Sequence, residues 1–169
     1  MRNAKYQIIP WMIVLLPFLL LAFSYGSLSS QILIARNIDG SGAVYAPRSA
    51  FVVFRVPLME LVCALAIEIM RRPFARDAVH RNYYLMWTAL LYTVGFKSLF
   101  QSLEIVFSTL SNVYFYLTAS VVVLGIVVAS VPGIKAFSGF SRKDRLFTIL
   151  QISALLGLLL AYIVLAFVL

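Results

Sequence analysis

Five long apolar runs constrain this chain more than any other feature of its sequence. Each run is long enough, or nearly so, to cross the roughly 30 Å hydrocarbon core of a bilayer as a helix. Apolar residues make up 63% of the chain, against about 45–50% in ordinary soluble domains. The sequence therefore predicts an all-α integral membrane protein, residues 1–169 forming a single polytopic membrane domain. The five transmembrane helices are predicted at about 8–23, 50–70, 83–107, 113–131 and 146–169.

Two of these runs carry features that bear on their limits. Pro132 and Gly133 follow the fourth run and are predicted to stop its helix. The first run follows the basic start MRNAK, so a cleaved signal peptide is an alternative reading. Its apolar stretch is long for a signal peptide, and residues 24–30 offer no clear A-x-A cleavage site. These two features favour a membrane span.

The distribution of Lys and Arg sets the predicted orientation. The N-terminus and the connections after the second and fourth runs are basic, whereas the first loop holds only Arg36 and Arg48. Because cytoplasmic loops carry an excess of Lys and Arg, the N-terminus is predicted to be cytoplasmic and the C-terminus external, in the plasma (inner) membrane. The net charge of +8 is then topological, and no nucleic-acid partner is expected.

The first external loop, residues 24–49, is the only connection of appreciable length between the predicted helices. It contains an apolar stretch at 31–35, the turn-forming pairs Asp-Gly and Ser-Gly over 39–42, and a second apolar pair at 44–45. This pattern predicts a short hairpin or strand–turn unit on the membrane surface. Loops of this length are often functional. Its charged residues are Arg36, Asp39 and Arg48, and Asn37 follows the first of them.

Four charged residues lie within the second and third apolar runs. A charge at the bilayer centre costs about 2.5–3.5 kcal/mol, so such residues are rare and usually functional. The residue numbers of Arg55 and Glu104 add to nearly the same total as those of Glu60 and Lys97. In an antiparallel pair of helices the mismatch in depth is about 3 Å at 1.5 Å per residue. One register can therefore form both ion pairs, Arg55–Glu104 and Glu60–Lys97.

The third run also carries a polar stripe at helical spacing. Its members are Thr93, Lys97, Gln101, Glu104 and Ser108. Residues at this spacing share one helix face, which must meet protein or water. In the functional interpretation, a proton or solute path is lined by Glu60, Lys97, Gln101 and Glu104. In the structural interpretation, which the matched pairs favour, they fix the register of the two helices.

Three further features have structural interpretations. Glu68 precedes Arg71 and Arg72 by three and four residues, which predicts a local ion pair at the cytoplasmic interface. The single cysteine, Cys63, and the single histidine, His80, favour neither a disulfide nor a metal site. No cofactor is expected. Small residues at four-residue spacing predict close helix packing, within the chain or with a partner: Gly125 and Ala129 in the fourth run, and Ser153, Gly157 and Ala161 in the fifth.

The order of first span, external loop and second span resembles the SdpI-type bacterial immunity and signalling membrane proteins and their uncharacterised N-terminal membrane domain. The resemblance covers about residues 15–70. Asn37, Gly40 and Arg48 stand about where that family has an asparagine, a glycine and a basic residue. The family's loop prolines are missing, and Ala35–Arg36 replace its His-aromatic pair. The resemblance implies a small polytopic protein that acts by binding, with the external loop as its recognition element. The candidate recognition residues are then Arg36, Asn37, Asp39 and Arg48.

Together these features predict a non-enzymatic membrane protein that acts by protein–protein binding. It would be of the immunity or signalling type, or an accessory subunit of a membrane complex, with a protein partner or a second copy in the lipid bilayer. The alternative is a small oligomeric transporter or proton-coupled carrier that uses the polar stripe, although no inverted repeat is visible. A membrane enzyme ranks last, because Glu60 and Glu104 are matched to cations and not to each other.

Overall fold

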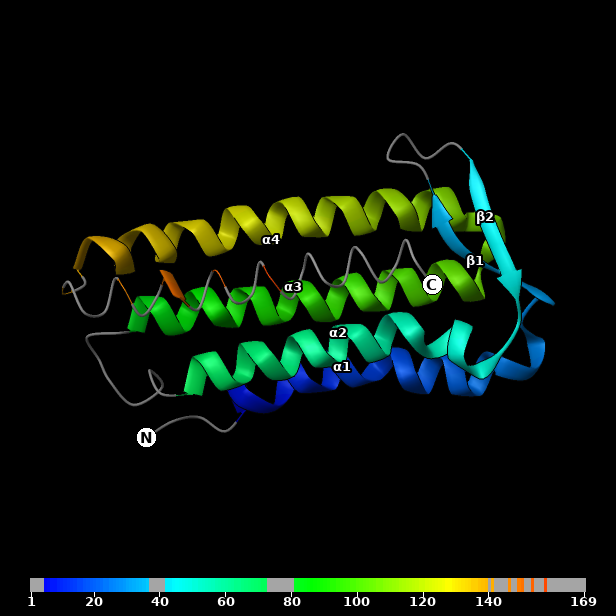
Figure 1. Cartoon of the computed structure of the whole chain (residues 1–169), viewed down its shortest axis with the longest axis horizontal. Helices are drawn as coiled ribbons and strands as arrows, with labels where there is room; N and C mark the ends of the chain where they lie inside the picture. The colour runs from blue at the N-terminus through cyan, green and yellow to red at the C-terminus, as the bar shows by residue number, and fades with distance from the viewer. Residues whose placement is uncertain are drawn as a thin grey trace.

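In the computed structural model of this chain, the described residues include four long helices that run in alternating directions (Figure 1). They are α1 (Lys5–Ser24), α2 (Ala50–Arg71), α3 (Arg81–Val106) and α4 (Ser111–Gly139). Two short 3₁₀ segments, η1 (Tyr25–Ser27) and η3 (Ser108–Leu110), and two strands, β1 (Gln31–Arg36) and β2 (Ala43–Pro47), join them. The structure describes residues 5–36, 42–72, 81–139, 141, 146, 149, 150, 153 and 157.

Helix α3 is the centre of the bundle, because it packs against α1, α2 and α4. Apart from Glu104, its buried positions follow helical spacing, so one continuous face is covered: Tyr83, Trp87, Leu91, Gly95, Ser98 and Ser102. The bulky half of this face forms a core with Val14 of α1 and Ala64 and Ile67 of α2. The other half is made of small side chains. A charged side chain on this half of α3 is therefore close to the neighbouring helices.

A second apolar cluster joins the loop after α1 to the helices. It contains Leu21 of α1, Leu28 after η1, Ile32 of β1 and Val53 of α2, all nearly inaccessible. Helix α2 begins beside this cluster, where the hydroxyl oxygen of Ser49 accepts a hydrogen bond from the Val52 backbone N–H at 3.2 Å. This is the preferred chemistry of a helix N-cap. The cluster fixes β1 against the end of the bundle.

The two strands pair antiparallel and form the short hairpin that the sequence predicted within residues 24–49. Gly42, just before β2, has a φ of 58°, a left-handed conformation that glycine adopts without a steric cost. The register passes from Leu33 opposite Tyr45 to Ala35 opposite Val44, so Ile34 is left out of the pairing as a bulge. The hairpin lies at the end of the bundle where α1 ends and α2 begins (Figure 1).

Three helical segments in the described part of the chain are long and apolar enough to cross a membrane. They are Ile8–Ser27, Ala50–Arg71 and Ser108–Ala136. They cover three of the predicted spans, and α3, which carries Lys97, Gln101 and Glu104, covers the third predicted span without being among them. The predicted fifth span, 146–169, lies almost entirely outside the described residues.

The predicted end of the fourth helix at Pro132 was wrong. Helix α4 continues through Pro132 and Gly133 to Gly139. Proline removes one backbone donor and disfavours a helix interior, but a neighbouring helix can compensate. Here the position of a Cβ on Gly133 would lie 3.0 Å from the sulfur of Met86 on α3. Packing against α3 therefore holds this part of the helix despite its proline.

Candidate functional site

Lys97 is at the centre of a polar contact between α2 and α3. Its Nζ forms an ion pair with the carboxylate of Glu60 on α2 and also donates to the side-chain oxygen of Gln101 at 3.1 Å. Glu60 is only 5% exposed. Lys97 and Gln101 are one helical turn apart on α3, so both acceptors reach the same ammonium group. The structure thus brings three of the predicted site residues together.

This network ties α2 to α3 at mid-bundle. Removing one member of a buried ion pair leaves the other charge uncompensated, at a cost of about 3–5 kcal/mol, whereas an apolar pair of similar volume is often tolerated. Glu60 is buried beside Ala64, which belongs to the core with Ile67 and Trp87. Because the network lies between packed helices, it is suited to fix the register of α2 against α3.

Arg55 has a different partner from the one that the sequence indicated. Its Nη2 donates to the backbone carbonyl oxygen of Ile34 at 2.7 Å. Ile34 is the bulged residue of β1, and the bulge leaves this carbonyl available. Among the ion pairs of the described residues, Arg55–Glu104 does not occur. Glu104 is itself buried on α3.

Arg48 holds the other side of the same loop. Its Nη1 donates to the carbonyl oxygen of Leu28 at 2.6 Å and to that of Tyr25 at 3.3 Å. The guanidinium also lies 5.6 Å from the centre of the Tyr25 ring, a cation–π distance. The Arg48 backbone N–H donates to the carbonyl of Ser30 at 2.8 Å. Arg48, predicted as a recognition residue, thus binds backbone carbonyls of the loop and holds the hairpin in position.

The other predicted recognition residues are placed less fully. Arg36 ends β1 and its backbone is opposite Ala43 of β2. Asn37 and Asp39 lie outside the described residues. Among the described residues of the two strands, the large hydrophobic side chains that are exposed are those of Val44 and Tyr45, at 55% and 53%. These two are not among the predicted recognition residues, although the sequence contains this apolar pair directly after the Gly-containing turn.

A second polar cluster lies at the opposite end of α2. The buried Arg71 forms an ion pair with Glu68, and Arg72 Nε lies 3.3 Å from the same carboxylate. These are the local pairs predicted from the i, i+3 and i, i+4 spacing. Arg71 also donates to the Thr88 hydroxyl at 3.1 Å and lies 5.0 Å from the centre of the Tyr84 ring. The cluster is therefore a contact between α2 and α3 as well as a local pair.

Small residues bring α3 and α4 into close contact. A Cβ on Gly125 would lie 2.0 Å from Oγ1 of Thr93, so only glycine fits there. Ala129, one turn on, is 4% exposed. The small residues predicted on the fourth span therefore serve packing within the chain. Thr93 belongs to this seam, and its hydroxyl donates to the Ala89 carbonyl at 2.9 Å.

The polar stripe is accordingly divided among three surroundings. Lys97 and Gln101 belong to the network with Glu60, and Thr93 belongs to the seam with α4. Ser108 begins η3, beyond the end of α3, and is exposed. Among the described residues, Thr93 and Ser108 therefore have different surroundings from Lys97 and Gln101.

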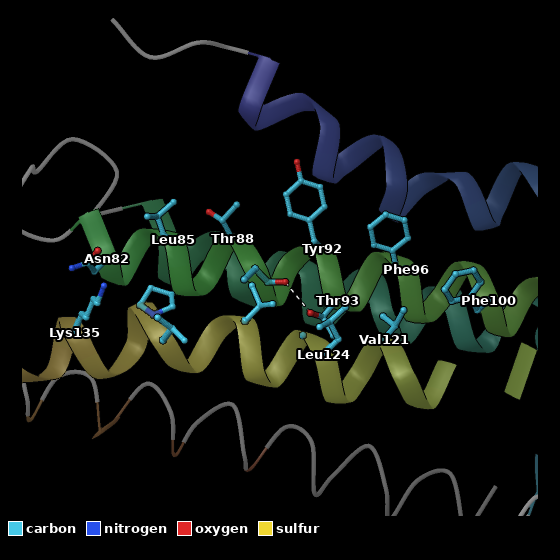
Figure 2. A pocket seen from close by; sticks show the side chains of 15 residues that line it. Asn82, Leu85, Thr88, Tyr92, Thr93, Phe96, Phe100, Val121, Leu124 and Lys135 are labelled. Carbon is cyan, nitrogen blue, oxygen red and sulfur yellow. Dashed lines mark hydrogen bonds between the residues drawn. The ribbon is translucent and has the colours of Figure 1, made fainter. Parts of the chain in front are cut away.

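Beside the seam, α3 and α4 form a groove of about 940 Å³ (Figure 2). Its lining is mostly apolar and includes aromatic side chains of α3 and aliphatic side chains of α4, and Asn82 and Lys135 lie at one end. Glu60, Lys97, Gln101 and Glu104 are not among its lining residues. The groove and the charged network are therefore separate features.

No protein-family model, curated protein or solved structure matches this chain. The similarity to SdpI-type proteins over residues 15–70 accordingly stays a prediction.

Proposed function

We propose that this chain is a non-enzymatic, multi-pass protein of the plasma (inner) membrane that binds a protein partner through its β1–β2 hairpin. The observation that carries the proposal is the way the hairpin is mounted. Arg48 and Arg55 bind backbone carbonyls of the loop, while Val44 and Tyr45 of β2 are exposed. A fixed scaffold thus presents an apolar and an aromatic side chain.

The proposed topology has five transmembrane helices, with the N-terminus cytoplasmic and the C-terminus external. The end of the bundle opposite the hairpin carries Arg71, Arg72, Arg81 and Lys135 (Figure 1). An excess of Lys and Arg marks the cytoplasmic side of a membrane protein. In this proposed topology the hairpin is on the external side, where a partner or a membrane-active toxin would meet it.

Two physical properties suit the hairpin to partner binding. Tyrosine is enriched in protein interfaces, because it offers a large amphipathic surface at low entropic cost. A surface that is already held in one conformation loses less entropy on binding. Three contacts hold this hairpin: Ile32 in the apolar cluster, Arg55 on the Ile34 carbonyl, and Arg48 on the Leu28 carbonyl.

The surroundings of the charges support binding over transport. Lys97 is engaged by Glu60 and Gln101 between packed helices, and the groove beside α4 is lined by none of these residues. A transporter needs its charged residues to line a path for the solute. The immunity or signalling role, or that of an accessory subunit, needs only a stable scaffold and a presented surface.

The test is purification in mild detergent followed by mass measurement of the complex. The parent chain should carry a stoichiometric protein partner, and Tyr45→Ala should lose it. Tyr116→Ala is the matched control, because Tyr116 lies on α4 and is 60% exposed, close to the 53% of Tyr45. Retention of the partner by Tyr45→Ala would contradict the proposal. So would a homo-oligomer without any partner, which would favour the transporter.

A further inference from the structure

We infer that the groove between α3 and α4 binds an anionic phospholipid, its headgroup phosphate held by Lys135 and Asn82 and one acyl chain lying along the apolar lining. This inference rests on the proposed membrane location but not on the proposed protein partner. The volume of about 940 Å³ is at the upper end of the range for small-molecule sites. The groove is thus large enough for part of a lipid.

The polarity of the groove changes along its length as that of a lipid does. Figure 2 shows the Lys135 and Asn82 side chains next to each other at one end, with Tyr92, Phe96 and Phe100 further along α3. From Asn82 to Phe100 the groove extends about 27 Å at 1.5 Å per residue. This is close to the thickness of the hydrocarbon core, so a lipid anchored at the polar end occupies the half nearest to it.

The polar end is suited to a phosphate. The Lys135 ammonium supplies positive charge and three donors, and the Asn82 amide supplies two more donors. Arg72 and Arg81 lie at the same end of the bundle, outside the groove lining. Basic pockets between transmembrane helices on the cytoplasmic side bind anionic headgroups, and the lipids of that leaflet are themselves rich in anionic species. The charge therefore favours an anionic over a zwitterionic headgroup.

The groove also opens where lipid can reach it. Ala129 and Ala136 are the buried hydrophobic residues of α4 among those described, whereas the aliphatic side chains around them, such as Leu124 and Val128, are more than half exposed. In the proposed topology the bilayer surrounds this helix. The bilayer itself supplies acyl chains that can cover these aliphatic side chains, so no second protein is needed.

The experiment is native mass spectrometry of the full chain, with added phosphatidylglycerol or phosphatidylcholine of identical acyl chains. The parent chain should retain phosphatidylglycerol with an about fivefold preference, the factor that one interfacial cation supplies. Lys135→Gln should abolish this preference, whereas Arg72→Gln, which removes a cation outside the groove, should keep it. Equal retention of both lipids by the parent chain would overturn the inference.

A steric variant tests the acyl-chain part. Val128 lines the groove and is 51% exposed, whereas its neighbour Val127 is 55% exposed and does not line it. Val128→Trp should lower the occupancy of both lipids, and Val127→Trp should not. If both tryptophan variants bind lipid like the parent chain, or if the parent appears as a dimer that excludes lipid, the groove has another occupant and the inference fails. Loss of lipid binding with the protein partner still bound would leave the proposed function standing.

Discussion

Lys97 on α3 forms an ion pair with Glu60 on α2, and the Glu60 side chain is only 7% exposed. The pair joins two helices that also share an apolar core around Ala64 and Trp87. A helix–helix contact made only of Leu, Val and Ile side chains tolerates a shift along the axis, whereas a buried charge tolerates only its partner. Neutralising one member of the Glu60–Lys97 pair should therefore destabilise the protein more than neutralising both.

The first prediction concerns single and double neutralisation of this pair. Lys97→Met leaves the Glu60 carboxylate buried without its cation and should destabilise the protein by about 3–5 kcal/mol. The double variant Glu60→Gln with Lys97→Met should recover most of that loss and keep partner binding. The measurement is thermal unfolding in detergent, followed by the pull-down. A stable double variant that had lost its cellular activity while keeping the partner would instead indicate a role in transport.

The second prediction concerns the seam between α3 and α4. A Cβ on Gly125 would lie 2.0 Å from Thr93 Oγ1, so Gly125→Ala must push the helices apart, at a cost of about 1–3 kcal/mol. Gly139→Ala is the matched control on the same helix, because a Cβ there meets no atom within 4 Å. Comparable melting temperatures for the two variants would show that the helices are not in this close contact.

The third prediction concerns the mounting of the hairpin. Arg55→Met removes the donor to the Ile34 carbonyl. A hydrogen bond from a charged group contributes about 1.5–3 kcal/mol, so the backbone amides of β1 should exchange with solvent at least about tenfold faster. Hydrogen–deuterium exchange measures this, with the amides of α4 as the internal reference. Unchanged exchange in β1 would mean that the apolar cluster around Ile32 alone holds the strand.

The fourth prediction concerns the buried Arg71. The Thr88 hydroxyl accepts a hydrogen bond from Arg71 Nη1 at 3.1 Å. Thr88→Val removes this acceptor and should destabilise the protein by about 1–3 kcal/mol. Thr88→Ser keeps the hydroxyl and should behave like the parent chain. The melting temperatures of the two variants provide the comparison. A valine variant as stable as the parent chain would contradict a contribution from this hydrogen bond, and a destabilised serine variant would point to packing of the Thr88 methyl group.

The sequence predicted the helices well because apolar runs at membrane length have few alternatives. The second predicted span, 50–70, differs from α2 by one residue at one end. The fourth was cut short at Pro132, since local propensity does not include the compensation that α3 provides through Met86. The number of membrane-spanning helices and their orientation stay predictions.

The candidate site was predictable where it depended on helix geometry alone. The Glu60–Lys97 contact and the pairs around Glu68 follow from spacing along and across helices. The partner of Arg55 was not predictable, because it depends on a bulge that exposes the Ile34 carbonyl and on how the hairpin folds back over α2. Such contacts are set by tertiary packing and leave no periodic signal in the sequence.

The most direct test of the central claim is in-cell photocrosslinking from the hairpin. A photoreactive amino acid at Tyr45 should capture one discrete protein, and the same group at Tyr116, which is similarly exposed, should capture none of it. The crosslink should disappear in a chain that also carries Arg48→Met and Arg55→Met, because the hairpin is then no longer held in position. Capture of the same protein from both sites, or of no protein from Tyr45, would contradict the proposal that the hairpin is the binding surface.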